Sequence, residues 1–145
     1  MARILCIDDS VSGLSVRRQL FERRGHEVIT ARSGPEGLER FRKDKFDLAV
    51  VDYVMPEMNG GEVIRQLRKL NPNLPVILLS GYADTLALEH SVPEADTVLH
   101  KGRSREVKEL LEAADDLLRR RRKPVGRAKF TGKAAAKPAT KRKLG

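Results

Sequence analysis

The sequence predicts an α/β protein with an open, doubly wound sheet of five parallel strands. Short apolar runs alternate with segments in which apolar residues recur every three or four positions. Such alternation is typical of repeated strand–helix units, whose crossovers place helices on both faces of a parallel sheet. Five units are too few for an eight-stranded barrel, so an open sheet remains, and we expect the strand order 2-1-3-4-5.

The five expected strands are the most apolar stretches of the chain. Cys6, the only cysteine, lies inside the first of them, and we expect it to be a small buried core residue rather than a reactive thiol. Runs of Val, Ile and Leu with little polar alternation indicate strands that are covered on both faces. The predicted strands cover residues 3–7, 27–31, 48–51, 76–79 and 97–99.

Five amphipathic helices are expected to follow these strands. Ser33 is predicted to cap the second helix, with Glu36 reaching back in a capping box and Pro35 in the first turn. The fourth helix, near residues 84–90, is short, and the fifth is expected to start after a Ser104 cap. The apolar faces of the first, third and fifth helices are expected to contain, in turn, Leu14, Val16, Leu20 and Phe21; Val63, Ile64, Leu67 and Leu70; and Val107, Leu110, Leu111, Ala114, Leu117 and Leu118.

Positive charge is concentrated at the C-terminal end. The chain has a formal net charge of +9, but residues 1–118 hold 17 of its 29 basic residues and all 20 acidic ones, a net charge of −3. We therefore expect one mildly acidic domain over residues 1–123 and a basic tail over residues 124–145. The tail is rich in Lys, Arg, Ala and Pro and is predicted to be disordered, with nonspecific nucleic acid, an acidic protein or a membrane surface as possible contacts.

Cysteine usage and hydropathy indicate the compartment. A single cysteine excludes an internal disulfide and fits a reducing environment. No apolar run approaches the roughly 20 residues of a membrane span. The first apolar run of the chain already ends at the charged residue Asp8, as a secretory signal would not. We therefore expect a cytoplasmic protein with no membrane span.

Polar side chains stand at the carboxyl ends of four predicted strands. Asp8 and Asp9 follow the first strand, Asp52 the third and Ser80 the fourth, and Lys101 comes just beyond the fifth. In the expected strand order the first and third strands are neighbours at the switch point, where ligands of such sheets bind. Three converging carboxylates need a cation, and an all-oxygen set favours Mg²⁺ over Zn²⁺. With the Lys101 ammonium facing it, such a pocket suits a phosphoryl group.

Two simpler interpretations of these acids explain less of the pattern. Asp9 or Ser10 could cap the first helix, but this leaves Asp8, Asp52 and Lys101 unexplained. Phosphatases of the haloacid-dehalogenase type also place an acid after the first strand. They need a second Asp two residues further on, where this chain has Ser10.

Over about residues 1–120 the chain resembles the response-regulator receiver domains of the CheY-like type. The resemblance rests on the motifs ILCIDDS, LAVVDYVMPEMNGGEVI, PVILLSGYAD and VLHKG, which occur in this order. It implies a flavodoxin-like fold and a role in two-component phosphorelay signalling. It also implies a regulatory domain that catalyses its own phosphorylation and dephosphorylation, rather than an enzyme acting on an external metabolite.

The resemblance assigns a role to each polar residue of the predicted site. Asp52 is implied as the acceptor of a phosphoryl group from a histidine kinase or a phosphotransfer protein. Ser80 is implied to hydrogen-bond the attached phosphoryl group, and Lys101 to pair with its charge. The implied Mg²⁺ ligands are Asp8, acting mainly through water, Asp9, Asp52 and the backbone carbonyl of Val54.

The chain departs from the family pattern at three positions. Val98 stands where the family has an aromatic residue that switches rotamer, and Tyr82 is a possible substitute. Gly102 replaces the proline that normally follows the lysine, which predicts a less preorganised Lys101. Val54 is apolar at a position that often governs access of water to the phosphoryl group, which predicts slow dephosphorylation.

The predicted site and the family resemblance together favour a single-domain response regulator. Its phosphorylated form is expected to signal to a downstream protein through the face formed by the fourth helix, the fifth strand and the fifth helix. One alternative is an intermediate or phosphate sink in a multistep phosphorelay. Another is a phosphate-independent adaptor whose basic tail binds nucleic acid.

Overall fold

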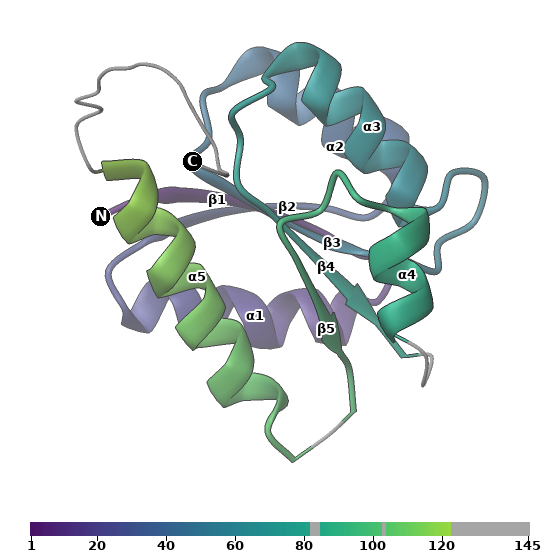
Figure 1. Ribbon diagram of the computed structural model, residues 1–145. Coiled ribbons are helices and arrows are strands. Elements are labelled where there is room, and N and C mark those ends of the chain that lie inside the picture. The colour runs from purple at the N-terminus through teal and green to yellow at the C-terminus, as the bar shows by residue number, and fades with distance from the viewer. Residues whose placement is uncertain (82–84, 103, 123–145) are drawn as a thin grey trace, which may run out of the picture.

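Five parallel strands form the central sheet, in the order β2-β1-β3-β4-β5 (Figure 1). The computed structural model describes residues 1–81, 85–102 and 104–122. The strands are β1 (Arg3–Ile7), β2 (Glu27–Ala31), β3 (Leu48–Asp52), β4 (Val76–Ser80) and β5 (Thr97–His100). The helices are α1 (Val11–Arg23), α2 (Gly34–Lys43), α3 (Gly60–Leu70), α4 (Thr85–Ser91) and α5 (Glu106–Arg122). The predicted fold class and strand order are confirmed.

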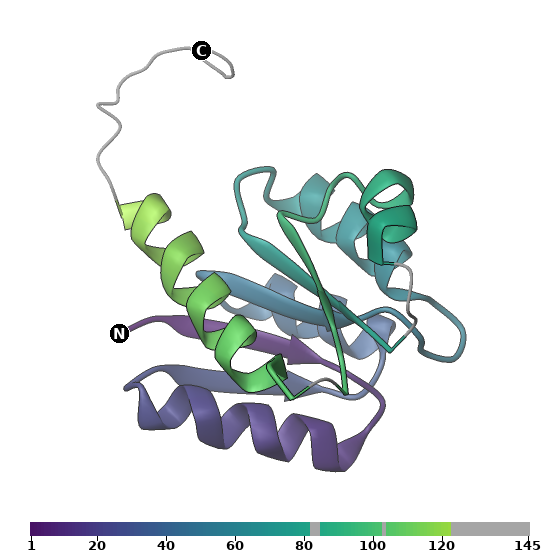
Figure 2. The ribbon, with the colours of Figure 1, turned by 60° about the horizontal axis from the view of Figure 1, so that its bottom comes forward.

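The helices form two layers around the sheet. Helices α1 and α5 cover one face, and α2, α3 and α4 cover the other (Figures 1 and 2). Successive side chains of a strand point to opposite faces, so Leu5 and Ile7 of β1 enter one apolar cluster while Ile4 and Cys6 enter the other. Burial raises the pKa of the Cys6 thiol to about 12, so this side chain remains a protonated core group.

Of the two predicted caps, Ser33 is confirmed and Ser104 is not, and Ser10 forms the cap that the simpler interpretation allowed. Ser10 caps α1, and its Oγ accepts a hydrogen bond from the Gly13 N–H at 3.1 Å. Ser33 caps α2, but the Glu36 carboxylate accepts from the Arg32 N–H instead of the Ser33 N–H, so the predicted capping box is only half formed. Helix α5 begins at Glu106, one residue later than a Ser104 cap requires.

The buried stripes of α1, α3 and α5 are narrower than predicted. Most of the expected apolar positions are buried, but Val16 is 52% exposed, Leu70 46% and Val107 45%. In α1 the buried stripe instead contains Arg17, between Leu14 and Phe21. The helical spacing of apolar residues thus predicts which side of a helix faces the core, but not how wide the buried stripe is. That width depends on the neighbouring elements.

The segment between β3 and α3 is held tightly against the end of β3. Asn59 and Glu62 form a capping box at the start of α3, with both hydrogen bonds at 3.0 Å. The Gly60 N–H donates to the Tyr53 carbonyl at 2.8 Å. A Cβ atom at Gly60 would lie 2.5 Å from the Asp52 carbonyl oxygen, a distance that no side chain tolerates. Glycine at this position therefore lets α3 approach the backbone of Asp52.

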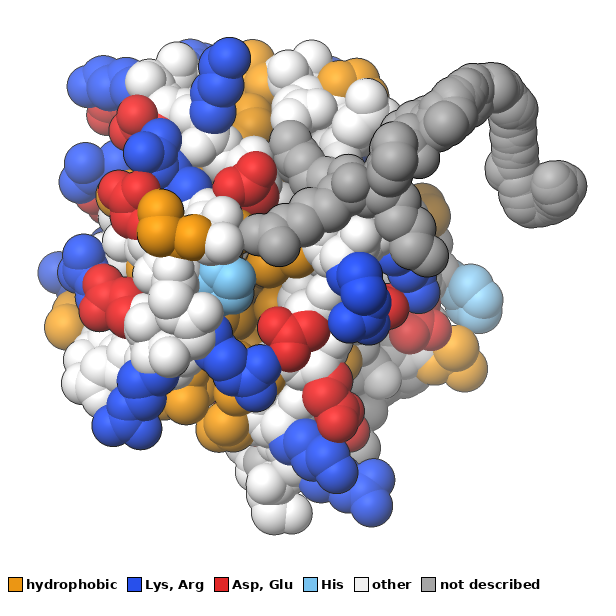
Figure 3. All heavy atoms as spheres, turned by 90° about the vertical axis from the view of Figure 1, so that its left-hand side faces the viewer, with side chains coloured by type: hydrophobic (Ala, Val, Ile, Leu, Met, Phe, Trp, Pro, Cys, Tyr) orange, Lys and Arg blue, Asp and Glu red, His pale blue; other side chains and the backbone are white. Residues whose placement is uncertain are grey.

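None of the helices in the described part of the chain combines the length and the apolar character that a membrane crossing requires. On the face shown in Figure 3, basic and acidic side chains lie interspersed over the described residues. The basic tail predicted for residues 124–145, its boundary at residue 123, and Tyr82 lie outside the described residues.

Replacing Gly60 with alanine is expected to lower the free energy of unfolding by about 1–3 kcal/mol, because the added methyl group collides with backbone atoms that cannot rotate away. Urea denaturation measures this change. Gly81→Ala is the control, since a Cβ at Gly81 meets no atom within 4 Å and should leave stability nearly unchanged. Equal stability of the two variants would contradict the prediction.

Candidate functional site

Parallel pairing of β1 with β3 brings their carboxyl ends to the same edge of the sheet. Ile7 pairs with Val51, so Asp8 and Asp52 come next at the same level. One carboxylate oxygen from each of Asp8, Asp9 and Asp52 lies within 4.8 Å of the others. Asp8 and Asp52 are buried, whereas Asp9 is exposed. The structure thus brings together the three acids that the sequence singled out.

Lys101 supplies a positive charge to these acids from the end of β5. Its backbone N–H donates to the Ser80 carbonyl at 2.8 Å, which continues the β4–β5 pairing to the edge of the site. The Lys101 Nζ lies 2.9 Å from Asp52 Oδ1 and 3.6 Å from Asp8 Oδ2. Gly102 follows with a φ of +84°, and the ammonium group still reaches both carboxylates.

Ser80 and Val54 lie around Asp52. Ser80 is fully buried as the last residue of β4, one position beyond Leu79, which pairs with Asp52 in the sheet. Val54 comes two residues after Asp52, and its side chain is 49% exposed. Val98, at the position of the family's aromatic residue, is buried in the cluster beneath α2, α3 and α4.

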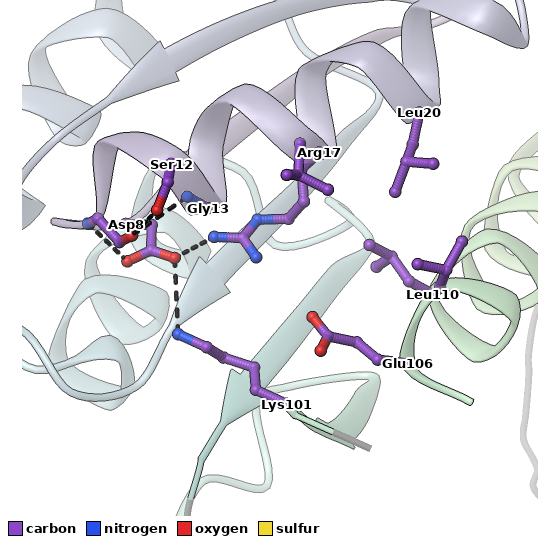
Figure 4. Close-up of a pocket in the computed structure, with 11 residues that line it drawn as sticks. Asp8, Ser12, Gly13, Arg17, Leu20, Lys101, Glu106 and Leu110 are labelled. Atoms are coloured by element: carbon purple, nitrogen blue, oxygen red, sulfur yellow. Dashed lines mark hydrogen bonds and ion pairs between the residues drawn. The ribbon is translucent and has the colours of Figure 1, made fainter. Parts of the chain in front are cut away.

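Arg17 of α1 is a member of the site that the sequence analysis missed. Its guanidinium Nη2 donates to Asp8 Oδ2, and both side chains are almost completely buried (Figure 4). The sequence does carry a signal for it, since Arg17 follows Leu14 by three positions and precedes Phe21 by four. That spacing puts Arg17 on the buried stripe of the helix. A basic residue there needs a buried acid, and Asp8 is that acid.

Burial is the main influence on the protonation of Asp52. Loss of solvent raises the pKa of Asp52 from 3.8 to about 6. The hydrogen bond from Lys101 lowers this pKa, and the nearby charge of Asp8 raises it. The protein therefore holds Asp52 in surroundings that oppose its negative charge.

The donor set fits Mg²⁺. The three acids offer oxygen atoms alone, two of them buried and one facing solvent, and hard divalent cations prefer such oxygens while keeping some water. A cation at this position would also relieve the repulsion between Asp8 and Asp52. Within the described residues this is the group of acids, histidines and cysteines whose geometry could hold a metal ion.

The raised pKa of Asp52 predicts a specific pH dependence of stability. Folding takes up a proton between about pH 4 and pH 6, so the wild-type free energy of unfolding falls as the pH rises through this window. The Asp52→Asn variant has no carboxyl group to titrate at this position, so its free energy of unfolding should not fall for this reason. In EDTA we expect the variant to match the wild type near pH 4 and to exceed it above pH 6 by on the order of 2–3 kcal/mol. Urea unfolding at several pH values measures the difference, and a difference independent of pH would contradict the assignment.

Comparisons with known proteins agree with this geometry. The family model described as "Response regulator receiver domain" matches residues 4–115. Protein PilH of Pseudomonas aeruginosa is 38% identical over 82 residues, which cover 55% of this chain and 68% of that protein. The chain spans only 18–32% of the length of the transcriptional regulatory proteins from Escherichia coli and Bacillus subtilis that it also matches.

Solved structures give the same result. A CheY-like response regulator receiver domain protein from Methanospirillum hungatei JF-1 is 31% identical, with a TM-score of 0.75 over 83% of this chain and 95% of that one. Response regulator protein TrrA from Thermotoga maritima, in complex with Mg²⁺-BeF, is also 31% identical, with a TM-score of 0.73 over 81% of this chain and 99% of that one. The chain therefore belongs to the response regulator receiver domain family.

Proposed function

We propose that this protein is a phosphorylation-controlled switch that accepts a phosphoryl group on Asp52 from a histidine kinase or a phosphotransfer protein. The observation that carries the proposal is that the carboxylates of Asp8 and Asp9, which follow β1, and of Asp52, at the end of β3, lie within 4.8 Å of one another. The Lys101 ammonium lies 2.9 Å from Asp52. The receiver family is regulatory. Because this chain belongs to that family, phosphoryl acceptance is the first activity to test.

In the proposed reaction Asp52 is the nucleophile. Above pH 6 its carboxyl is largely ionised, and one oxygen attacks the phosphorus of a phosphohistidine. The new oxygen–phosphorus bond forms as the phosphorus–nitrogen bond breaks, and the imidazole leaves with the bonding electron pair. In this proposal Lys101 pairs with the phosphoryl oxygens and the Ser80 hydroxyl hydrogen-bonds them, which the 2.9 Å distance between the Lys101 Nζ and Asp52 Oδ1 supports for the lysine.

The residues that would hold Mg²⁺ are Asp8, Asp9, Asp52 and the backbone carbonyl of Val54. When bound, this ion supplies positive charge that offsets the repulsion between the acids and the incoming phosphoryl oxygens. TrrA, at 31% identity, was solved with Mg²⁺-BeF, which supports the assignment of this cation. Hydrolysis of the aspartyl phosphate by water would later return the protein to its starting state.

Signal output is proposed to pass to a downstream protein through the face formed by α4, β5 and α5. The backbone of Lys101 is bonded to Ser80 across β4 and β5, so a change in the partners of either side chain acts on the strand at this face. The protein's location is proposed to be the cytoplasm, which the single cysteine in the sequence supports.

Incubation with Mg²⁺ and a small acyl phosphate is expected to add the mass of one phosphoryl group, as measured by intact-protein mass spectrometry. Asp52→Asn should abolish the gain because it removes the nucleophile. Asp44→Asn, which changes an exposed acid outside the site, should keep it. If neither a small acyl phosphate nor a cognate kinase gives a mass gain, the switch is ruled out and a phosphate-independent adaptor is favoured.

The phosphorylated protein is expected to lose its phosphoryl group more slowly than a Val54→Asn variant. An amide at this half-exposed position can orient an attacking water, which the valine side chain cannot do. The half-life of the phosphorylated form by mass spectrometry tests this, with Val54→Leu as the apolar control. Equal half-lives for Val54→Asn and the wild type would contradict it.

A further inference from the structure

We propose that Arg17 is an internal counter-ion of the acid cluster, which competes with a divalent cation for Asp8 and so limits how tightly the site takes up Mg²⁺. The inference rests on the function proposed above, because it concerns the same acids. It goes beyond that function by assigning a residue of α1 to the control of metal affinity.

Both carboxylate oxygens of Asp8 accept a hydrogen bond from the protein. Its Oδ2 accepts from the Arg17 guanidinium, and its Oδ1 accepts from the Ser10 N–H at 3.0 Å. The side chains of Arg17 and Asp8 are only 6% and 1% exposed, so little water is present to replace either partner. Asp8 Oδ2 also lies 3.6 Å from the Lys101 Nζ, so it is the oxygen that faces the cluster. A cation that approaches this oxygen, directly or through a water, must therefore share it with Arg17 or displace the guanidinium.

Gly13 provides the space for this ion pair. It lies one helical turn before Arg17, and a Cβ atom there would be 2.9 Å from Arg17 Nη2 and 3.1 Å from Asp8 Oδ2. A side chain at position 13 would push the guanidinium away from the carboxylate. Gly13 and Arg17 therefore act as one unit within α1, and they give a second way to weaken the same contact.

The charges of the cluster favour competition over cooperation. Arg17 and Lys101 both lie against Asp8, and Lys101 also contacts Asp52. The charges of Arg17 and Lys101 therefore offset two of the three negative charges of Asp8, Asp9 and Asp52. Repulsion between a divalent ion and a guanidinium on the same carboxylate is strong at such range, because a buried site screens charge poorly. Removing Arg17 should therefore strengthen divalent binding.

A cavity of about 310 Å³ beside Arg17 offers the displaced guanidinium a place to go. It lies between α1 and α5 and is lined by Val16, Leu110 and Glu106 as well as by Arg17 and Lys101 (Figure 4). The Glu106 carboxylate faces this cavity from α5, with its Oε1 accepting from the Gly102 N–H at 2.7 Å. Its other oxygen would offer an acceptor to a guanidinium that turns into the cavity. The ion pair with Asp8 can thus open without leaving Arg17 in a wholly apolar space.

Calorimetric titration of the full chain with Mg²⁺ tests the inference. Arg17→Leu and Gly13→Ala are both expected to bind Mg²⁺ roughly tenfold more tightly than the wild type, because each removes or displaces the competing charge. The matched control is Arg18→Leu. Arg18 is the next residue of α1, and it pairs with Glu22 on the exposed surface. This variant should bind Mg²⁺ as the wild type does.

Thermal unfolding gives a second readout. Without metal, Arg17→Leu should melt below the wild type, since Asp8 loses its buried partner. The rise in melting temperature on adding Mg²⁺ should be larger in both variants than in the wild type. If Arg17→Leu does not fold, Gly13→Ala, which retains the arginine, carries the test alone.

Two failures can be told apart. If the wild type binds Mg²⁺ and Gly13→Ala and Arg17→Leu bind it equally or more weakly, the inference is overturned while the proposed function stands. If neither the wild type nor any variant binds Mg²⁺, the assignment of the metal site fails, and the inference fails with it.

Discussion

Close approach of buried carboxylates at the ends of β1 and β3 is the constraint around which this edge of the protein is organised. Parallel register alone brings Asp8 beside Asp52, and neither side chain can escape to solvent. Two buried carboxylates this close together oppose folding unless nearby cations neutralise their charges. Arg17 of α1 and Lys101, which follows β5, supply these cations, so two elements outside the acid-bearing strands each contribute a positive charge to one site.

This arrangement makes the site sensitive to changes in charge. Lys101 contacts both buried acids, so a new negative group on Asp52 would alter its balance between them. The backbone bond from Lys101 to Ser80 connects that balance to the pairing of β4 and β5. A local electrostatic event at one carboxylate therefore has a short physical route to the outer strand of the sheet and its neighbouring helices.

Much of the fold could be predicted because apolar runs and helical spacing report directly on burial. The acids and the lysine could be predicted as one site because the carboxyl ends of parallel strands share an edge. Arg17 lies outside this rule, and its one signal in the sequence is its spacing from Leu14 and Phe21 on the buried stripe of α1. An arginine in a helix is usually solvated, and its burial here depends on Asp8 from another element and on the space left by Gly13.

The remaining differences also come from contacts between elements. Glu36 reaches back to the Arg32 N–H because the backbone before α2 presents that donor, a detail that the Ser33–Glu36 spacing alone does not specify. Val16 and Val107 are about half exposed because α1 and α5 leave the cavity between them open instead of packing along their whole length. Local sequence patterns describe one element at a time, whereas these outcomes depend on two.

The backbone conformation at Gly102 limits which residues can be exchanged between this protein and other members of its family. A proline is held near a φ of −65°, whereas Gly102 has a φ of +84°. The residue most common after the lysine in receiver domains therefore cannot be introduced here alone without a new chain path between β5 and α5. Grafting between this protein and a relative would have to exchange that connection as a whole, with the lysine and the glycine transferred together.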